Sequence, residues 1–259
     1  MKRTDGTYEI AHHSFYVKNI VDSNYSHKPT IVFLHDALGS AESWNTFPSE
    51  VCRSLELNGL LYDRLGYGRS AAYYGSWQKG YMEVEAFEIL PQILSHFHLR
   101  NPILLGISDG GSIALLYASR HSQLTALISI AGHIMVEEKT KNAIAVTAKE
   151  PLNSKLAAGL QKYHGNQTSS LLTRWQSTWL SEGFATWDIT DCLAQIKVPS
   201  LVMQGEEDQY ASSQQCYDIG LGIGSSATAK IIKGCGHFPT KEKPQETIEL
   251  IDKFLRPLL

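Results

Sequence analysis

Short runs of consecutive apolar residues recur along the chain, and most of them end at or near a glycine. They lack the polar–apolar alternation of a half-solvated strand and lie at residues 30–34, 59–62, 102–106, 126–131, 199–204 and 229–232. Continuous apolar runs are typical of strands that are buried on both faces of a parallel sheet. Residues 8–10 and 14–17 alternate instead, which predicts an antiparallel hairpin at the sheet edge.

Helical spacing of apolar residues appears between these runs. Residues 82–98 show it, although Pro91 must kink the helix or begin a second piece. Residues 112–119 are small and apolar, as expected of a helix packed on a sheet, and residues 244–255 begin with a proline that suits a first helical turn. The alternation of strands and helices predicts an α/β fold with an open sheet.

Residues 134–189 interrupt this alternation, because they contain no predicted buried strand and have the pattern of several helices. Large aromatic residues lie close together there: Trp175, Trp179, Phe184 and Trp187. Such an insertion between core strands predicts a helical cap. We therefore divide the chain into an α/β core, residues 1–133 and 190–259, and a cap, residues 134–189. The aromatic residues either line a pocket or hold the insertion onto the core.

The segment Gly106-Ile107-Ser108-Asp109-Gly110-Gly111 joins a predicted strand to a predicted helix. A serine between glycines at such a junction occupies a sharp turn with its hydroxyl exposed, since flanking Cβ atoms would clash. The amide of Asp109, at the helix N-terminus, can donate to an oxyanion. We therefore predict that Ser108 is a nucleophile and that the Asp109 N–H is one oxyanion donor.

A serine hydroxyl needs a base to take its proton. Among ten histidines, His237 is the candidate, because it lies in a glycine-rich loop between the last predicted strand and the final helix. The acid is expected after the preceding strand. Asp208 is preferred there, because the Gly-x-x-Asp turn aims its side chain at the histidine, while Glu206 and Glu207 remain alternatives.

These segments, in the chain order serine, acid, histidine, resemble the α/β-hydrolase superfamily over essentially the whole chain. The detailed match is most similar to capped bacterial serine hydrolases with a His-Glu-Gly-Leu-Gly-Ser-type loop and a Gly-His-Ser-Asp-Gly-Gly elbow. The resemblance implies the α/β-hydrolase fold, with a mostly parallel eight-stranded sheet flanked by helices and a helical cap. Here the elbow has Ile107 in place of the histidine.

The first loop of the family corresponds to His35-Asp36-Ala37-Leu38-Gly39-Ser40. The resemblance implies that its Ala37 N–H supplies the second oxyanion donor. Most of the superfamily has glycine where this chain has Asp36, and a carboxylate beside a developing oxyanion opposes it unless paired. Asp36 is therefore predicted either to bind a structural partner or to contact a cationic or hydroxylated substrate group.

Other residues have more modest predicted roles. The segment that contains Asp63 and Arg64 resembles the family's structural loop, with its charges in a local ion pair. His133 is predicted to line the substrate pocket, with Asp36, Trp175 and Trp179, or else to make a local hydrogen bond. The segment Glu137-Glu138-Lys139 is predicted to be a solvated helix start.

The composition of the chain limits which binding partners are expected. With 23 basic and 26 acidic residues the net charge is −3, so no basic excess exists to hold nucleic acid. No apolar run reaches the roughly 18 residues of a membrane span, and no secretory signal is expected, which predicts a cytoplasmic protein. The four scattered cysteines are expected to be free thiols. The histidine pairs His12-His13 and His96/His98 have no carboxylate or cysteine companion, so no metal site is expected there.

The sequence therefore predicts a serine hydrolase that needs neither cofactor nor metal and cleaves a small-molecule ester or related carbonyl compound through an acyl-enzyme on Ser108. Serine at the elbow argues against hydrolases that use an aspartate nucleophile. The alternatives are a carbon–carbon bond hydrolase of ring-cleavage products, perhydrolase or haloperoxidase side chemistry, and a ligand-binding receptor on a hydrolase scaffold. No pattern in the sequence indicates the acyl group, the leaving group or the oligomeric state.

Overall fold

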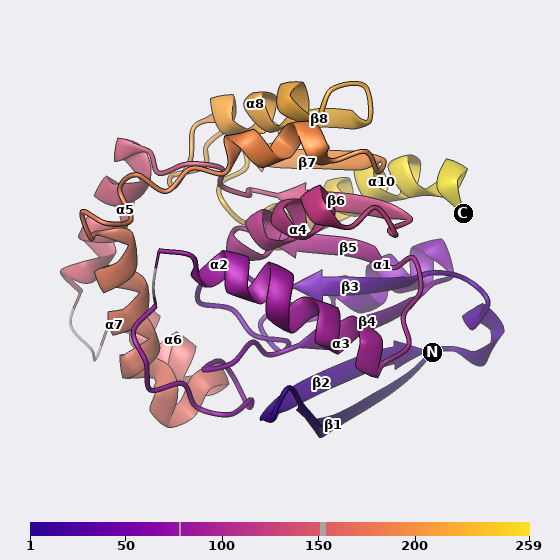
Figure 1. Ribbon diagram of the computed structural model, residues 1–259, viewed down its shortest axis with the longest axis horizontal. Helices are drawn as coiled ribbons and strands as arrows, with labels where there is room; N and C mark the ends of the chain where they lie inside the picture. The colour runs from indigo at the N-terminus through magenta and orange to yellow at the C-terminus, as the bar shows by residue number, and fades with distance from the viewer. Residues whose placement is uncertain (78, 151–153) are drawn as a thin grey trace.

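The computed structural model describes residues 1–77, 79–150 and 154–259, and a single eight-stranded sheet runs through them in the order β1-β2-β4-β3-β5-β6-β7-β8 (Figure 1). The strands are β1 (Lys2–Ile10), β2 (His13–Val21), β3 (Thr30–Leu34), β4 (Asn58–Tyr62), β5 (Ile103–Ile107), β6 (Ala126–Ile130), β7 (Ser200–Gly205) and β8 (Ala227–Ile232). Strand β2 pairs antiparallel with β1 and β4, and the other neighbours are parallel. This confirms the predicted α/β-hydrolase sheet and its edge hairpin.

Helices cover both faces of the sheet. Helices α1 (Phe47–Leu55) and α10 (Pro244–Leu255) pack on one face, and α3 (Leu90–His96), α4 (Asp109–Arg120) and α8 (Ser213–Ile223) pack on the other. Strand β3 shows why the apolar runs are continuous. Its residues Ile31 and Phe33 join one hydrophobic cluster, whereas Val32 and Leu34 join the other, and all four are buried.

The helix predicted over residues 82–98 is broken, as Pro91 requires. It consists of α2 (Tyr81–Val84), one π-helical turn (Glu85–Ile89) and α3. Proline has no N–H to donate to the carbonyl four residues earlier, so the regular hydrogen-bond ladder cannot pass through it. The widened turn brings the Glu85 carboxylate into the interior, where it accepts a 2.6 Å hydrogen bond from the Tyr62 hydroxyl.

The insertion, residues 134–189, contains the helices α5 (Glu138–Ala148), α6 (Lys155–His164) and α7 (Thr168–Trp179). They lie beyond the carboxyl ends of the parallel strands (Figure 1). An isolated antiparallel bridge between Met135 and Asp188 joins the two ends of the insertion. None of the helices in the described parts of the chain has the length and apolar character that a bilayer span requires.

The remaining short helices of the described chain are α9 (Pro239–Glu242), which precedes α10, and 3-10 helices at Ser23–Tyr25, Gly165–Gln167, Thr190–Gln195 and Arg256–Leu258. The four cysteines are free, as predicted.

Candidate active site

Ser108 occupies the turn between β5 and α4 in a strained backbone conformation, with φ 54° and ψ −121°. The neighbouring glycines have no room for a side chain. A Cβ at Gly106 would lie 2.0 Å from the Gly110 carbonyl oxygen, and a Cβ at Gly110 would lie 2.0 Å from the Leu34 carbonyl oxygen. Backbone packing therefore requires glycine at these two positions. A strained backbone such as that of Ser108 is common at functional sites.

His237 and Asp208 meet beside this turn, from the loops after β8 and β7. The Nδ1 atom of His237 lies 3.0 Å and 2.9 Å from the two carboxylate oxygens of Asp208. Burial opposes ionisation of Asp208, but its hydrogen bonds to His237 and to the Tyr210 amide outweigh this and lower the pKa of the carboxyl. Because Nδ1 is held by Asp208, Nε2 is the ring atom left for a reacting group.

The other carboxylates of the acid turn have different positions. Glu206 accepts a 3.2 Å hydrogen bond from the Gly234 amide, and Glu207 is exposed. Asp208 is thus the carboxylate that contacts His237. In the described chain the Ser108 hydroxyl makes no hydrogen bond, to His237 or to any other group. Catalytic hydrogen bonds often form only after substrate binds.

The loop after β3 turns sharply around Asp36. One oxygen of its carboxylate accepts a 2.9 Å hydrogen bond from the Leu38 amide, so Asp36 has the structural partner that was one of its two predicted roles. Its carboxylate also lies on the pocket wall. The neighbouring Ala37 N–H donates to no described residue, and the Asp109 N–H belongs to the first turn of α4, where no intrahelical acceptor exists.

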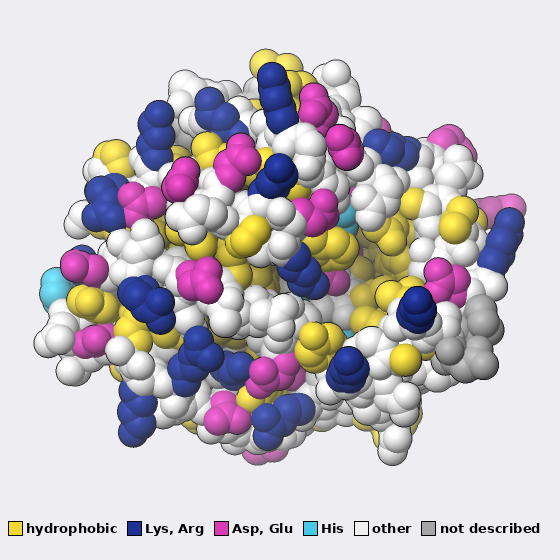
Figure 2. All heavy atoms as spheres, turned by 180° about the vertical axis from the view of Figure 1, so that it is seen from behind, with side chains coloured by type: hydrophobic (Ala, Val, Ile, Leu, Met, Phe, Trp, Pro, Cys, Tyr) yellow, Lys and Arg dark blue, Asp and Glu magenta, His cyan; other side chains and the backbone are white. Residues whose placement is uncertain are grey.

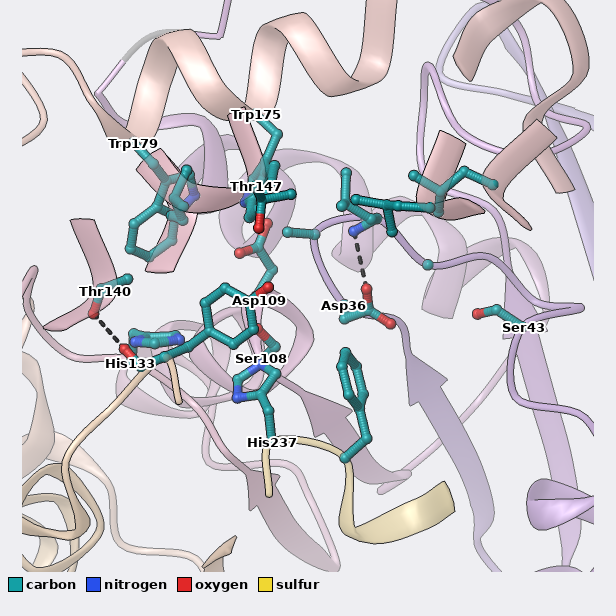
Figure 3. Close-up of a pocket in the computed structure, with 18 of the residues that line it drawn as sticks. Asp36, Ser43, Ser108, Asp109, His133, Thr140, Thr147, Trp175, Trp179 and His237 are labelled. Atoms are coloured by element: carbon teal, nitrogen blue, oxygen red, sulfur yellow. Dashed lines mark hydrogen bonds between the residues drawn. The ribbon is translucent and has the colours of Figure 1, made fainter. Parts of the chain in front are cut away.

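A cavity of about 240 Å³ opens above Ser108. Its walls are mainly apolar, and Figure 2 shows apolar side chains inside a hollow of this face of the molecule. The predicted residues that line it are Asp36, Ala37, Ser108, Asp109, His133, Trp175, Trp179 and His237, while Asp208 stands behind His237. Figure 3 shows Ser108 and His237 on one side and the two tryptophans of α7 on the other. The structure thus brings the predicted site residues together.

His133 is a buried member of this wall, 3% exposed, with its ring 6.0 Å from that of His237 and 5.3 Å from that of Trp179. Burial, reinforced by the nearby His237, lowers the pKa of His133 to about 4. Its Nδ1 atom has no hydrogen-bond partner among the described residues. A neutral imidazole with an unused polar atom therefore faces the cavity region.

Aromatic residues hold the insertion onto the core, as one of the two predicted alternatives states. Trp179 donates to the Tyr81 hydroxyl and Trp187 to Glu83.

The insertion's other polar attachments were not revealed by the sequence. His164 of α6 accepts from the Gly68 amide at 2.9 Å and lies 2.9 Å from the Leu38 carbonyl oxygen. Arg174 of α7 donates to the carbonyl oxygens of Tyr73 and Gly66. Nothing in the local sequence marks these side chains, because their partners are backbone groups about 100 residues away.

A helix starts here as predicted, α5 at Glu138, but the prediction of a solvated start was wrong for Glu137. Its carboxylate is not simply solvated: it accepts hydrogen bonds from the Ser212 amide, at 2.8 Å, and from the Gln215 side chain, at 2.7 Å. Gln215 also accepts from the Ile134 amide. These contacts fix the start of the insertion against α8. The local charge pattern did not show that α8 would provide polar partners.

Comparisons with known proteins find relatives along most of the chain. A proline iminopeptidase from Lactobacillus helveticus is 24% identical over 278 residues, covering 89% of this chain and 90% of that protein. A 2-hydroxy-6-oxo-6-phenylhexa-2,4-dienoate hydrolase from Comamonas testosteroni is 23% identical over 254 residues, covering 87% of each. The crystal structure of the enol-lactonase from Burkholderia xenovorans LB400 shares the fold, with a TM-score of 0.76 at 15% identity, over 97% of this chain and 100% of that chain.

The sequence pattern described as "Alpha/beta hydrolase family" matches residues 31–250, which include the turn around Ser108, the acid turn and His237. The match spans most of the sheet and both junctions of the insertion. The chain therefore belongs to the alpha/beta hydrolase family, and its activity is that of a hydrolase.

Proposed function

We propose that the protein is a serine hydrolase that cleaves a small ester or related carbonyl compound through an acyl-enzyme on Ser108. The observation that carries the proposal is the paired imidazole of His237 and carboxylate of Asp208, 2.9 Å apart, in the wall of the cavity that Ser108 lines. A buried, ionised carboxylate behind an imidazole is the arrangement that lets the imidazole accept a proton from a hydroxyl.

The proposed reaction begins when His237 Nε2 takes the proton of Ser108 as its oxygen attacks the substrate carbonyl. The N–H groups of Ala37 and Asp109 bind the resulting oxyanion. His237 then gives the proton to the leaving group, and the carbon–oxygen bond to that group breaks. A water molecule, deprotonated by the same imidazole, attacks the acyl carbon. The bond from that carbon to the Ser108 oxygen then breaks, His237 returns the proton to Ser108, and the acid leaves.

The lining of the cavity is mainly apolar, which supports a substrate with an apolar acyl group. Of its two described carboxylates, Asp109 is engaged by the Tyr81 hydroxyl and Arg64, whereas Asp36 accepts one hydrogen bond, from the Leu38 amide. The residues that the insertion contributes to the lining are Thr140, Ile144, Thr147, Leu156, Leu160, Tyr163, Trp175 and Trp179. An aminopeptidase would need a carboxylate for the substrate's ammonium group, and the insertion's lining residues provide none, which leaves Asp36 as the candidate for that role.

Residues 134–189 serve as the cap in this proposal. Trp175 and Trp179 would exclude water from the acyl group, which strengthens the oxyanion contacts. The relation to capped bacterial serine hydrolases with a Gly-x-Ser-Asp-Gly-Gly elbow is part of the same proposal. A cytoplasmic location and the absence of a nucleic-acid partner remain predictions from the sequence.

A second candidate follows from the similarity to the Comamonas hydrolase, whose substrate name is that of a dienoate. Hydrolysis of a carbon–carbon bond would use the same serine, histidine and aspartate. A dienoate also carries a carboxylate, and Lys241, which lies 4.7 Å above the Phe238 ring at the cavity wall, is a cation that could bind it. Activity on a vinylogous diketone acid that is lost in Lys241→Ala, with ester activity kept, would favour this candidate.

The test of the proposed function is a panel of p-nitrophenyl esters of graded acyl length. We expect turnover of at least one ester, and losses of about 10³-fold or more in kcat for both Ser108→Ala and His237→Ala. His121→Asn, outside the cavity, is the control and should retain wild-type rates. Equal rates in wild type and Ser108→Ala would contradict the proposal, and no turnover of any ester would favour the receptor alternative.

A further inference from the structure

Arg64 is an interior arginine whose charge the proposed mechanism does not use. It is 3% exposed and lies between the loop after β3 and the start of α4. Its Nη2 atom donates a 2.9 Å hydrogen bond to the main-chain carbonyl oxygen of Asp36. Its Nη1 atom lies 3.5 Å from the Asp109 carboxylate, which also accepts a 2.7 Å hydrogen bond from the Tyr81 hydroxyl. One guanidinium therefore contacts both Asp36 and Asp109, the two residues that lie near Ser108 in Figure 3.

The Asp36 contact matters because of peptide geometry. The carbonyl of Asp36 and the N–H of Ala37 belong to the same planar trans peptide, so they point in opposite directions. Holding the carbonyl from behind fixes the direction of the N–H on the other side. A charged donor on the carbonyl also polarises the peptide and makes the N–H a stronger donor.

His35 holds the same carbonyl, and its tautomer follows from its contacts. The Arg64 amide donates to His35 Nε2 at 3.1 Å, so Nε2 carries no proton. Nδ1 must then carry one, and it donates to the Asp36 carbonyl oxygen at 2.8 Å. Burial, reinforced by the Arg64 charge, keeps the pKa of His35 well below its ordinary value, in agreement with a neutral ring.

We infer that Arg64 is a positioning residue that aligns one oxyanion donor, the Ala37 N–H, through the Asp36 carbonyl, while its ion pair with Asp109 anchors the guanidinium at the start of α4. This inference rests on the proposed serine hydrolase function. It assigns a role in transition-state stabilisation to a side chain that touches no substrate. Loss of Arg64 should therefore lower kcat and leave KM nearly unchanged, because the oxyanion forms only after binding.

A neighbouring cavity makes a specific test possible. It has a volume of about 400 Å³ and is lined by Arg64, Tyr67, Trp77 and Tyr81, among others. The Nε atom of Arg64 has no hydrogen-bond partner in the described chain. Truncation of Arg64 would leave a hole continuous with this cavity, of the right shape for a free guanidinium ion to enter and replace the lost group.

Arg174 supplies a matched control. It is also buried, binds two main-chain carbonyl oxygens, those of Tyr73 and Gly66, and has an unpartnered Nε atom in the described chain. Its partners lie outside the oxyanion loop. A general requirement for buried arginines would affect both variants alike, whereas the inferred role is specific to Arg64.

The experiment compares ester hydrolysis by wild type, Arg64→Ala and Arg174→Ala, with and without about 50 mM guanidinium chloride, which is far below denaturing concentrations. We expect kcat of Arg64→Ala to fall about 100-fold, KM to change less than about threefold, and guanidinium to restore about tenfold in kcat. Arg174→Ala should show no recovery. The inference is overturned if kcat of Arg64→Ala stays within about threefold of wild type, or if guanidinium does not increase it.

Arg64→Lys covers the case in which Arg64→Ala does not fold. An ammonium group keeps the charge but cannot span both partners, so kcat should fall about tenfold, and a trifluoromethyl ketone should bind weaker by the same factor. Unchanged kcat in Arg64→Lys would overturn the inference. No wild-type turnover would contradict the proposed function and this inference together, whereas wild-type turnover with an unaffected Arg64 variant contradicts only the role of Arg64.

Discussion

The turn around Ser108 and the insertion at residues 134–189 face each other across the cavity, but they are held in place by different forces. The turn is fixed by backbone contacts, because Gly106 approaches the Gly110 carbonyl and Gly110 approaches the Leu34 carbonyl of β3 too closely for any side chain. The insertion is held by side chains such as His164 and Arg174, which bind backbone groups of a distant loop.

This difference implies that the turn determines the reaction and the insertion determines which substrate binds. A turn fixed by backbone sterics keeps the reacting atoms in place whatever the substrate, and it tolerates almost no substitution. An insertion fixed by individual polar side chains can change its shape by exchanging those residues, which leaves the sheet intact. We therefore expect substitutions near Ser108 to have large effects on rate or folding and substitutions in the insertion to have small ones.

The largest expected effect is that of Asp208→Asn. The amide cannot stabilise a charged His237 and favours the wrong imidazole tautomer, so kcat should fall about 10⁴-fold while the fold persists. Steady-state kinetics on the best ester measures it. Glu206→Gln, in the same turn, is the matched control and should keep kcat within a few-fold of wild type. Equal losses in both variants would mean that Asp208 has no special role.

Gly106→Ala should have the next largest effect. The added methyl would lie 2.0 Å from the Gly110 carbonyl oxygen, and neither backbone atom can move without displacing the turn. We expect the free energy of unfolding to fall by about 4 kcal/mol or more, as in other severe steric clashes. Urea unfolding followed by circular dichroism measures this. A loss below about 1 kcal/mol would show that the turn is more adaptable than its packing indicates.

His133 should make stability depend on pH. Its pKa of about 4 in the folded protein lies below the ordinary value, so between these values the unfolded chain binds a proton that the folded one does not. The contribution of neutral His133 to the free energy of unfolding is fully present above about pH 6.5. It decreases as the pH falls, by about 2 kcal/mol between pH 7 and pH 5.

The measurement compares the free energy of unfolding at these two pH values in wild type and His133→Gln. The variant should lose less stability on acidification, by about 2 kcal/mol, because it cannot take up the proton. His27→Gln, at an exposed position, serves as the control and should match wild type. Identical pH dependence in wild type and His133→Gln would contradict the buried, neutral state of His133.

The smallest expected effect belongs to the insertion. Gly159 lies within α6, and a Cβ there meets nothing within 4 Å. Gly159→Ala should therefore raise the free energy of unfolding by about 0.5–1 kcal/mol, since alanine has the higher helix propensity. It is the counterpart of Gly106→Ala in the other region. A destabilisation similar to that of Gly106→Ala would remove the contrast between the two regions.

Much of the fold was predictable because its determinants are local. Buried strands such as β3 need apolar residues on both faces, and the turn at Ser108 needs glycines at fixed spacing, so both leave a pattern in the sequence. The break at Pro91 was predictable for the same reason, since one missing donor is enough to cause it.

The remainder depends on contacts between distant segments. Helices α1 and α8 were not predicted, and α8 contains two glycines that weaken its helical pattern. The sequence placed Arg64 in a structural loop but did not show that its charge is buried between Asp36 and Asp109. Glu137 has the local pattern of a solvated helix start, and only the fold brings Ser212 and Gln215 to it.

The most direct test of the central claim is covalent labelling by a fluorophosphonate, which reacts with a serine hydroxyl only when a base and an oxyanion site activate it. Intact-mass analysis of the wild type should show one adduct, and peptide mapping should place it on Ser108. Ser108→Ala and His237→Ala should remain unlabelled under the same conditions. A wild type that stays unmodified, or an adduct on any residue other than Ser108, would contradict the account.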